Sequence, residues 1–139
     1  IPKNPSGETL AHRAAEGAML PVIRAALDKA LAGTEFHAKQ VKGLSAEELC
    51  KKYVSAGTPV IFWGTIEMAE PFKGDSWEFK GKKITWIRPE HCLLLVGYDS
   101  DNYIFCDPMR QEDKTAYPKS SVERAYEALH SQAVVIERK

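Results

Sequence analysis

One histidine and one aspartate stand at the outer ends of a predicted β-hairpin. Two apolar and aromatic runs, residues 91–98 and 103–106, are separated by polar residues at 99–102, which predicts two antiparallel strands and their turn. His91 begins the first run and Asp107 follows the second. Both side chains can point to one face if the turn holds an odd number of residues or a bulge interrupts a strand. Because a carboxylate fixes the tautomer of a neighbouring imidazole, His91 and Asp107 are a candidate general base and its orienting partner.

Each of these two residues also has an ordinary structural explanation. A histidine at the start of an apolar strand can simply hydrogen-bond to backbone, and an Asp-Pro sequence such as Asp107-Pro108 is a common start of a turn. The matching positions across one hairpin favour a functional pair, but spacing alone leaves both interpretations open.

None of the three cysteines is an obvious nucleophile. Cys50 lies in the middle of a predicted helix, and Cys92 and Cys106 directly neighbour His91 and Asp107 in the sequence. Because side chains alternate along a strand, Cys92 and Cys106 are expected to point away from the pair. A metal site made of these four residues would need adjacent strand residues to converge, which is disfavoured. We therefore expect buried, structural cysteines, no metal site and no cofactor.

The composition is that of an ordinary globular domain of 139 residues, with 44% hydrophobic and 27% charged residues. The formal net charge is zero, so no electrostatic footprint suggests nucleic acid or a membrane surface as a partner. We find no apolar run long enough for a transmembrane helix and no signal peptide pattern. Because the chain opens at Ile1 within a turn-rich sequence, we expect an N-terminal truncation. The sequence does not specify the oligomeric state.

The elements that would position the pair suggest a single α+β domain over residues 1–139, with N-terminal helices followed by a mostly antiparallel sheet. We expect a loop at 1–18. Helices are predicted at 19–31, from Ser45 to Gly57 and at 120–130, the last two with a serine and a glutamate at capping-box spacing. The remaining predictions are a possible edge strand at 35–41, a buried strand at 59–65, a second hairpin at 77–87, a polar loop at 109–118 and a strand at 132–136.

A few other side chains that could do chemistry have simpler explanations. Glu67 and Met68 follow the buried strand and are expected in a solvated loop. The histidines outside the hairpin, His12, His37 and His130, have no evident partner in the sequence and are expected at the surface.

Several short motifs follow one another in a specific order along the chain. They are Pro-Val-Ile at 21–23, Pro-Val-Ile-Phe-Trp at 59–63, residues 84–91 ending in Pro-Glu-His, Leu-Val-Gly-Tyr-Asp at 95–99, Asp-Pro at 107–108, and residues 126–129 leading into 131–136. This series resembles the peptidase-like family related to bacteriocin-processing, double-glycine cysteine peptidases, which is family thirty-nine of the papain-like clan. The resemblance extends from about residue 19 to near the end of the chain.

The resemblance implies a papain-like fold in which His91 is the general base and Asp107 the orienting residue. The family's nucleophilic cysteine begins a helix near the start of the domain, with a glutamine nearby for the oxyanion hole. Both would precede residue 1, so the chain would be the C-terminal portion of the domain and inactive by itself. The implied function is hydrolysis of a peptide or amide substrate; a peptidoglycan amidase-like activity and a catalytically inactive binding module are the alternatives. The resemblance also implies a Gram-positive bacterium and an extracellular or cell-surface location.

Overall fold

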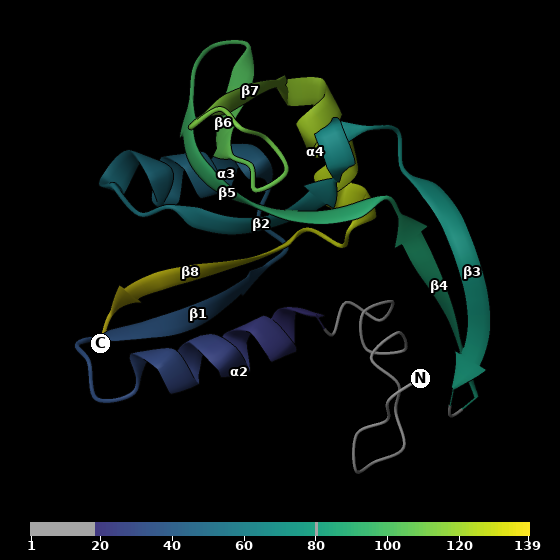
Figure 1. The fold of residues 1–139 in the computed structure, drawn as a ribbon, viewed down its shortest axis with the longest axis horizontal. Coiled ribbons are helices and arrows are strands. Elements are labelled where there is room, and N and C mark those ends of the chain that lie inside the picture. Colours follow the sequence, from purple (N-terminus) through teal and green to yellow (C-terminus); the bar gives the residue numbers. More distant parts are fainter. Residues whose placement is uncertain (1–18, 80) are drawn as a thin grey trace.

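A six-stranded sheet forms the centre of the protein in a computed structural model that describes residues 19–79 and 81–139 (Figure 1). All its neighbouring strands pair antiparallel. This confirms the predicted α+β fold with a mostly antiparallel sheet. The predicted loop at 1–18 lies outside the described residues. In spatial order the strands are β1 (Phe36–Lys42), β8 (Gln132–Arg138), β2 (Val60–Thr65), β5 (Glu90–Tyr98), β6 (Asn102–Cys106) and β7 (Thr115–Pro118).

Helices cover both faces of this sheet. Helix α2 (Met19–Leu31) packs along β1 and β8 on one face, whereas α3 (Ala46–Lys52) and α4 (Lys119–Ala128) lie on the other (Figure 1). No helix in the described part of the chain is both long and apolar enough to cross a bilayer.

The alternation of side chains along the strands creates two hydrophobic cores. On the side of α3 and α4, the ring of Phe62 stacks on Tyr126 with centroids 4.6 Å apart and meets Phe105 edge-on at 5.3 Å. On the side of α2, Trp63 and Val134 are fully buried. The continuous apolar run of β2 is explained by this two-sided burial, as predicted from the sequence.

A second, two-stranded ribbon leaves the main sheet between β2 and β5. It consists of β3 (Phe72–Phe79) and β4 (Lys82–Arg88) and extends beyond the edge of the main body in Figure 1. Within it, the rings of Trp77 and Trp86 lie 6.4 Å apart. The predicted hairpin at 77–87 is confirmed, and its first strand begins earlier, at Phe72.

Helix α3 begins at the predicted capping box and ends earlier than predicted. The Ser45 hydroxyl accepts a hydrogen bond from the Glu48 amide, and the Glu48 carboxylate accepts one from the Ser45 amide, both at 3.1 Å. The helix stops at Lys52, however, and a short 3-10 helix, η1 (Val54–Ala56), follows. Gly57, with a φ of 87°, then turns the chain toward β2, so the prediction of one helix to Gly57 is wrong.

The region before and within α4 corrects two further predictions. The loop predicted at 109–118 contains strand β7, which pairs with β6. The capping box predicted from Ser120 and Glu123 does not form, because α4 begins at Lys119 and places Ser120 inside its first turn. The helix also ends at Ala128 rather than at 130, since His130 and Ser131 both adopt positive φ angles that turn the chain into β8.

The aromatic contacts around Phe62 give a first testable prediction. Replacing Phe62, which is fully buried, with alanine leaves a cavity between β2, β6 and α4, and should lower the free energy of unfolding by about 3–5 kcal/mol. Phe72 is 58% exposed, so Phe72→Ala is the matched control and should change this free energy by less than about 0.5 kcal/mol. Urea unfolding followed by circular dichroism measures both; equal effects would contradict this assignment of the core.

Candidate active site

A bulge in strand β5 sets the orientation of the site residues. Leu94 and Leu95 pair with Cys106 and Phe105, but Gly97 pairs with Ile104, so Val96 is one extra residue in β5. When the register of Leu94 is continued, Asp107 stands opposite Leu93, whose side chain points to the same face as that of His91. The bulge that the hairpin needed is therefore present.

The structure brings the two sequence-predicted residues into direct contact. Nε2 of His91 lies 2.8 Å from Oδ1 of Asp107. Only 11% of the histidine side chain and 2% of the aspartate side chain are exposed. A charge-assisted hydrogen bond of this length in a buried setting fixes the orientation of the imidazole ring. The pair lies on the sheet face that carries α3 and α4, because β5 alternates and Leu93 and Leu95 belong to that core.

Asp107 is held by more than the histidine. Its Oδ1 also accepts a hydrogen bond from the Met109 amide at 2.9 Å, and its Oδ2 accepts one from the Tyr117 hydroxyl at 2.8 Å. Its carbonyl oxygen accepts a bond from the Arg110 amide at 3.0 Å. The residue thus starts a turn and contacts the histidine at once.

These contacts decide the charge of the Asp107 carboxyl group. Burial alone would raise its pKa, but the hydrogen bonds from His91, the Met109 amide and Tyr117 outweigh burial and lower the pKa below 3.8. Asp107 is therefore an anion at neutral pH, and it acts as an acceptor toward the imidazole.

The bond to Nε2 determines which atom of His91 can do chemistry. When Nε2 donates its proton to Asp107, the neutral ring carries its lone pair on Nδ1. No group in the described part of the chain hydrogen-bonds to this nitrogen. His91 can thus accept a proton at Nδ1 from a partner outside the described residues.

No signal in the sequence indicated the glycine that lies beside His91. Gly64 on β2 pairs directly with His91, and a side chain at Gly64 would meet the sulfur of Met68 at 3.1 Å. Met68 is 5% exposed, so the expectation that it lies in a solvated loop is wrong: its thioether fills the space that the glycine leaves open. Glu67 is exposed, as expected, and forms an ion pair with Arg110 at 3.3 Å.

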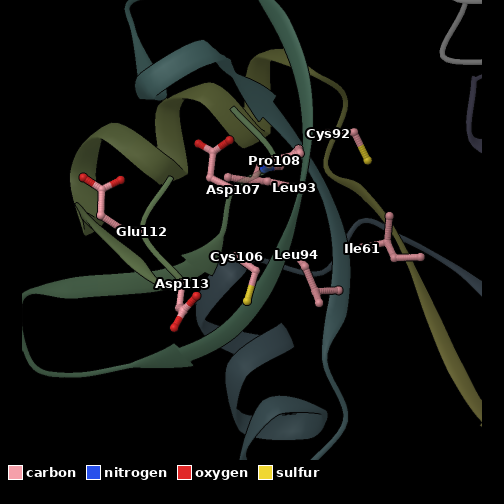
Figure 2. A pocket seen from close by; sticks show the side chains of 9 residues that line it. All are labelled: Ile61, Cys92, Leu93, Leu94, Cys106, Asp107, Pro108, Glu112 and Asp113. Carbon is pink, nitrogen blue, oxygen red and sulfur yellow. The ribbon is translucent and has the colours of Figure 1, made fainter. Parts of the chain in front are cut away.

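The three cysteines differ in burial: Cys50 is buried as predicted, whereas Cys92 and Cys106 are only half-buried. Cys50 is fully buried in α3. Figure 2 shows the sulfur of Cys106 and the carboxylate of Asp107 pointing in opposite directions. Burial raises the pKa of both Cys50 and Cys92 to about 11, which keeps these thiols protonated and unreactive at neutral pH. No group of three or more His, Cys, Asp or Glu side chains in residues 19–79 and 81–139 could hold a metal ion.

Two hollows lie along β5, and Glu90, Cys92 and Leu94, which help to line them, alternate with His91 and so face away from its imidazole. One, of about 300 Å³, is bounded by the start of β5 and the β3–β4 ribbon and contains Glu90 and Trp86. Burial raises the pKa of the Glu90 carboxyl group. The other, of about 410 Å³, opens beside Asp107 (Figure 2) and has an apolar floor with acidic residues at its rim. It is lined by residues that include Ile61, Cys92, Leu94, Cys106, Glu112 and Asp113.

The histidines outside the hairpin are not equivalent. His37 was expected to lack a partner, but it lies opposite Glu137 on β8, with 3.6 Å between its Nε2 and the carboxylate. It is therefore a second histidine–carboxylate pair, far more exposed than the first, with 40% of the histidine side chain accessible. His130 is exposed, as expected, and His12 lies outside the described residues.

The lowered pKa of Asp107 predicts how stability depends on pH. Because the folded-state pKa lies below the unfolded value of about 3.8, the ionised carboxylate stabilises the fold above that pH. This contribution is lost as the pH falls through the folded-state pKa. The stability advantage of the wild type over Asp107→Asn should therefore shrink between about pH 5 and about pH 2.

Urea unfolding at a series of pH values measures this difference. Asp113→Asn, at an exposed carboxylate in the same loop, is the matched control and should follow the wild type throughout. A constant difference between the wild type and Asp107→Asn across this range would show that the carboxylate of Asp107 is not selectively stabilised in the folded state.

Comparisons with known proteins agree with the geometry. A crystal structure described as that of a C39-like peptidase from Bacillus anthracis superposes with a TM-score of 0.63 and 29% sequence identity. The match covers 73% of this chain and 52% of the other, so the chain spans about half the length of that protein. A search of curated proteins found no match. The family model of the Peptidase_C39 like family matches residues 14–134, and the chain therefore belongs to this C39-related, peptidase-like family.

Proposed function

We propose that this chain supplies the general base and the orienting residue of a cysteine peptidase-like active site, which hydrolyses a peptide or amide bond. The observation that carries the proposal is the buried 2.8 Å hydrogen bond between His91 Nε2 and Asp107 Oδ1, which leaves Nδ1 of the imidazole as the basic atom. A neutral imidazole held in one orientation by a carboxylate is what a thiol nucleophile needs beside it.

The nucleophile in this proposal comes from outside the chain. Cys50 and Cys92 have raised pKa values, and the side chain of Cys106 points away from the side on which Asp107 meets His91. The family resemblance supports a cysteine at the start of a helix that precedes residue 1 in the sequence, accompanied by an oxyanion-hole glutamine.

The reaction would proceed in two stages. The thiol gives its proton to Nδ1 of His91, and the thiolate attacks the carbonyl carbon of the amide. The imidazolium then returns the proton to the leaving amine as the carbon–nitrogen bond breaks, which produces a thioester and a free amine. Water, activated by the same nitrogen, hydrolyses the thioester. Asp107 remains ionised throughout and stabilises the imidazolium.

The proposed chemistry does not restrict the substrate to one class of amide. Peptides, leader sequences and cell-wall amides share the bond that this chemistry cleaves.

A catalytically inactive binding module is the second candidate. It is favoured by one observation, the absence of a suitable thiol among the cysteines of this chain. The sequence immediately upstream discriminates between the two: a cysteine at the start of a predicted helix, with a glutamine just before it, supports the hydrolase, and their absence supports the binding module.

The proposal predicts a loss of activity that is confined to one histidine. In the protein extended upstream to include the cysteine, His91→Ala should lower kcat/KM by at least about 100-fold, because general base catalysis is removed. His37→Ala is the matched control, since it removes a histidine that also contacts a carboxylate but lies at the edge of the sheet; its activity should be unchanged. Hydrolysis of peptide libraries and of cell-wall fragments measures the rates and identifies the substrate class.

The chain of residues 1–139 should cleave neither kind of substrate by itself. Cleavage by this chain that Cys50→Ser abolished would contradict the proposed source of the nucleophile. Full activity of the extended His91→Ala protein would contradict the proposed base.

A further inference from the structure

Asp107 has one side-chain hydrogen bond that belongs neither to the turn nor to the pair with His91, and its donor is the phenol of Tyr117. Tyr117 lies on β7, 6% exposed, and its hydroxyl reaches Oδ2 of Asp107 at 2.8 Å. The other carboxylate oxygen, Oδ1, accepts the bonds from His91 and Met109. Oδ2 thus accepts from the phenol, and Oδ1 accepts from the imidazole and from the backbone of the turn.

The charge of Asp107 directs the proton of this phenol. An ionised carboxylate can only accept, so the Tyr117 hydroxyl donates to Oδ2. Arg110 lies beside the same phenol: burial and the bond to Asp107 raise the pKa of Tyr117, whereas the guanidinium of Arg110 acts to lower it. The guanidinium also forms an ion pair with Glu67.

Without the phenol, the terminal torsion of Asp107 would be less restrained. The terminal torsion of an aspartate is broad, so hydrogen bonds rather than a rotamer well fix the plane of the carboxylate. Without the phenol, Oδ2 of Asp107 would be a buried acceptor with no donor, which is costly. A carboxylate that turned to find another donor for Oδ2 would move Oδ1 out of line with His91 Nε2.

We propose that Tyr117 is a positioning residue: its phenol holds the Asp107 carboxylate in the plane in which that carboxylate bonds His91 Nε2. This inference rests on the proposed function of His91 and Asp107. Tyr117 acts through Asp107 and touches neither the imidazole nor the substrate.

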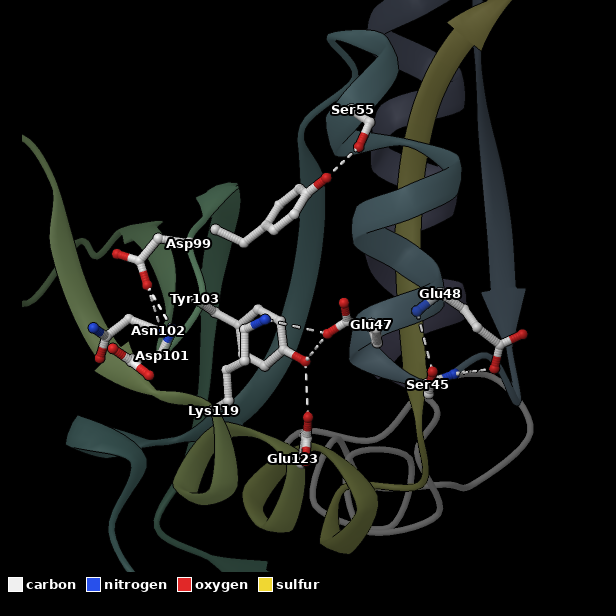
Figure 3. A network of polar contacts seen from close by, with 11 residues as sticks. Ser45, Glu47, Glu48, Ser55, Asp99, Asp101, Asn102, Tyr103, Lys119 and Glu123 are labelled. Atoms are coloured by element: carbon white, nitrogen blue, oxygen red, sulfur yellow. Dashed lines mark hydrogen bonds and ion pairs between the residues drawn. The ribbon is translucent and has the colours of Figure 1, made fainter.

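Tyr103 provides a matched control in the same pair of strands, β6 and β7. It lies on β6 directly opposite Tyr117 and is fully buried. Its hydroxyl also meets carboxylates, Glu123 at 2.8 Å and Glu47 at 3.1 Å (Figure 3). Removing that hydroxyl therefore reproduces the loss of a phenol–carboxylate bond, a partly buried one in this case, without changing any contact of Asp107.

The proton on His91 Nε2 is the signal that tests the proposal. A ring proton held by a buried carboxylate resonates at low field and exchanges slowly with water, and both can be measured by NMR in the 139-residue protein. At about pH 8, above the ordinary histidine pKa of about 6.5, the signal is assigned by its loss in Asp107→Asn. In Tyr117→Phe we expect an upfield shift and an exchange rate about tenfold higher, the effect of weakening one charged hydrogen bond.

The controls separate positioning from general destabilisation. Tyr103→Phe should leave the position and exchange rate of this proton unchanged, even if it lowers the free energy of unfolding as much as Tyr117→Phe does. Tyr117→Phe should also raise the pKa of Asp107, which carbonyl carbon NMR measures, because one of the bonds that lower this pKa is removed. Arg110→Met, at a partly exposed side chain, removes the charge that acts to lower the pKa of Tyr117 and should change the proton signal in the same direction by a smaller amount.

Three outcomes would overturn the proposal. If the proton signal in folded Tyr117→Phe matches the wild type, Tyr117 is a structural residue only. If Tyr117→Phe does not fold, an unchanged signal in Arg110→Met overturns the proposal in the same way. If the wild type itself lacks a low-field proton that depends on Asp107, the histidine–aspartate pair is absent in solution, and the proposed function fails together with the role of Tyr117.

Discussion

A carboxylate that is removed from water needs hydrogen-bond donors on its oxygens, and the site depends on how this chain supplies them to Asp107. The donors come from three different elements: the imidazole of His91 on β5, the backbone of Met109 in the following turn, and the phenol of Tyr117 on β7. These elements are separate in the structure, but all three place a hydrogen-bond donor against the same carboxylate. Because the cost of an unpaired buried charge is several kcal/mol, the arrangement of β5, the turn and β7 is coupled through this one group.

The aromatic core beneath the site keeps these elements in register. Phe105 on β6 contacts both Phe62 on β2 and Tyr117 on β7, and Phe62 stacks on Tyr126 of α4. The strand that carries the phenol is thus packed on the same ring that anchors the centre of the sheet. His91 and Tyr117 therefore lie on packed strands and Asp107 directly follows the end of β6, and placement on regular elements favours the precise geometry that a catalytic hydrogen bond needs.

Much of this arrangement could be predicted from the sequence because it follows from local periodicity. The hairpin of β5 and β6, the two-sided burial of β2 and the pairing of His91 with Asp107 all depend on alternation along strands. Strand β7 could not be predicted, because its four residues, which end in Pro118, have the composition of a polar loop. The role of Tyr117 could not be predicted for the same reason. Ser45 and Ser120 precede glutamates at the same spacing, yet only Ser45 caps a helix. The chain enters α4 directly from β7, and no local pattern shows that Ser120 falls inside the first turn. The partner of His37 depends on a pairing between distant strands, which is not visible in one sequence.

The single extra residue in β5 has a consequence for how this hairpin can change in length. Val96 shifts the pairing of β5 with β6 by one residue. The odd-numbered residues before Val96 and the even-numbered residues after it therefore pair as if they belonged to one continuous alternation. A deletion of one residue between His91 and Gly97 would preserve two apolar strands and their turn but would rotate the imidazole to the face occupied by Cys92. Changes by two residues would keep the imidazole on its present face. Length variation among relatives in this segment should therefore come in even steps, which distinguishes descendants that retain the histidine–aspartate contact from those that keep only the fold.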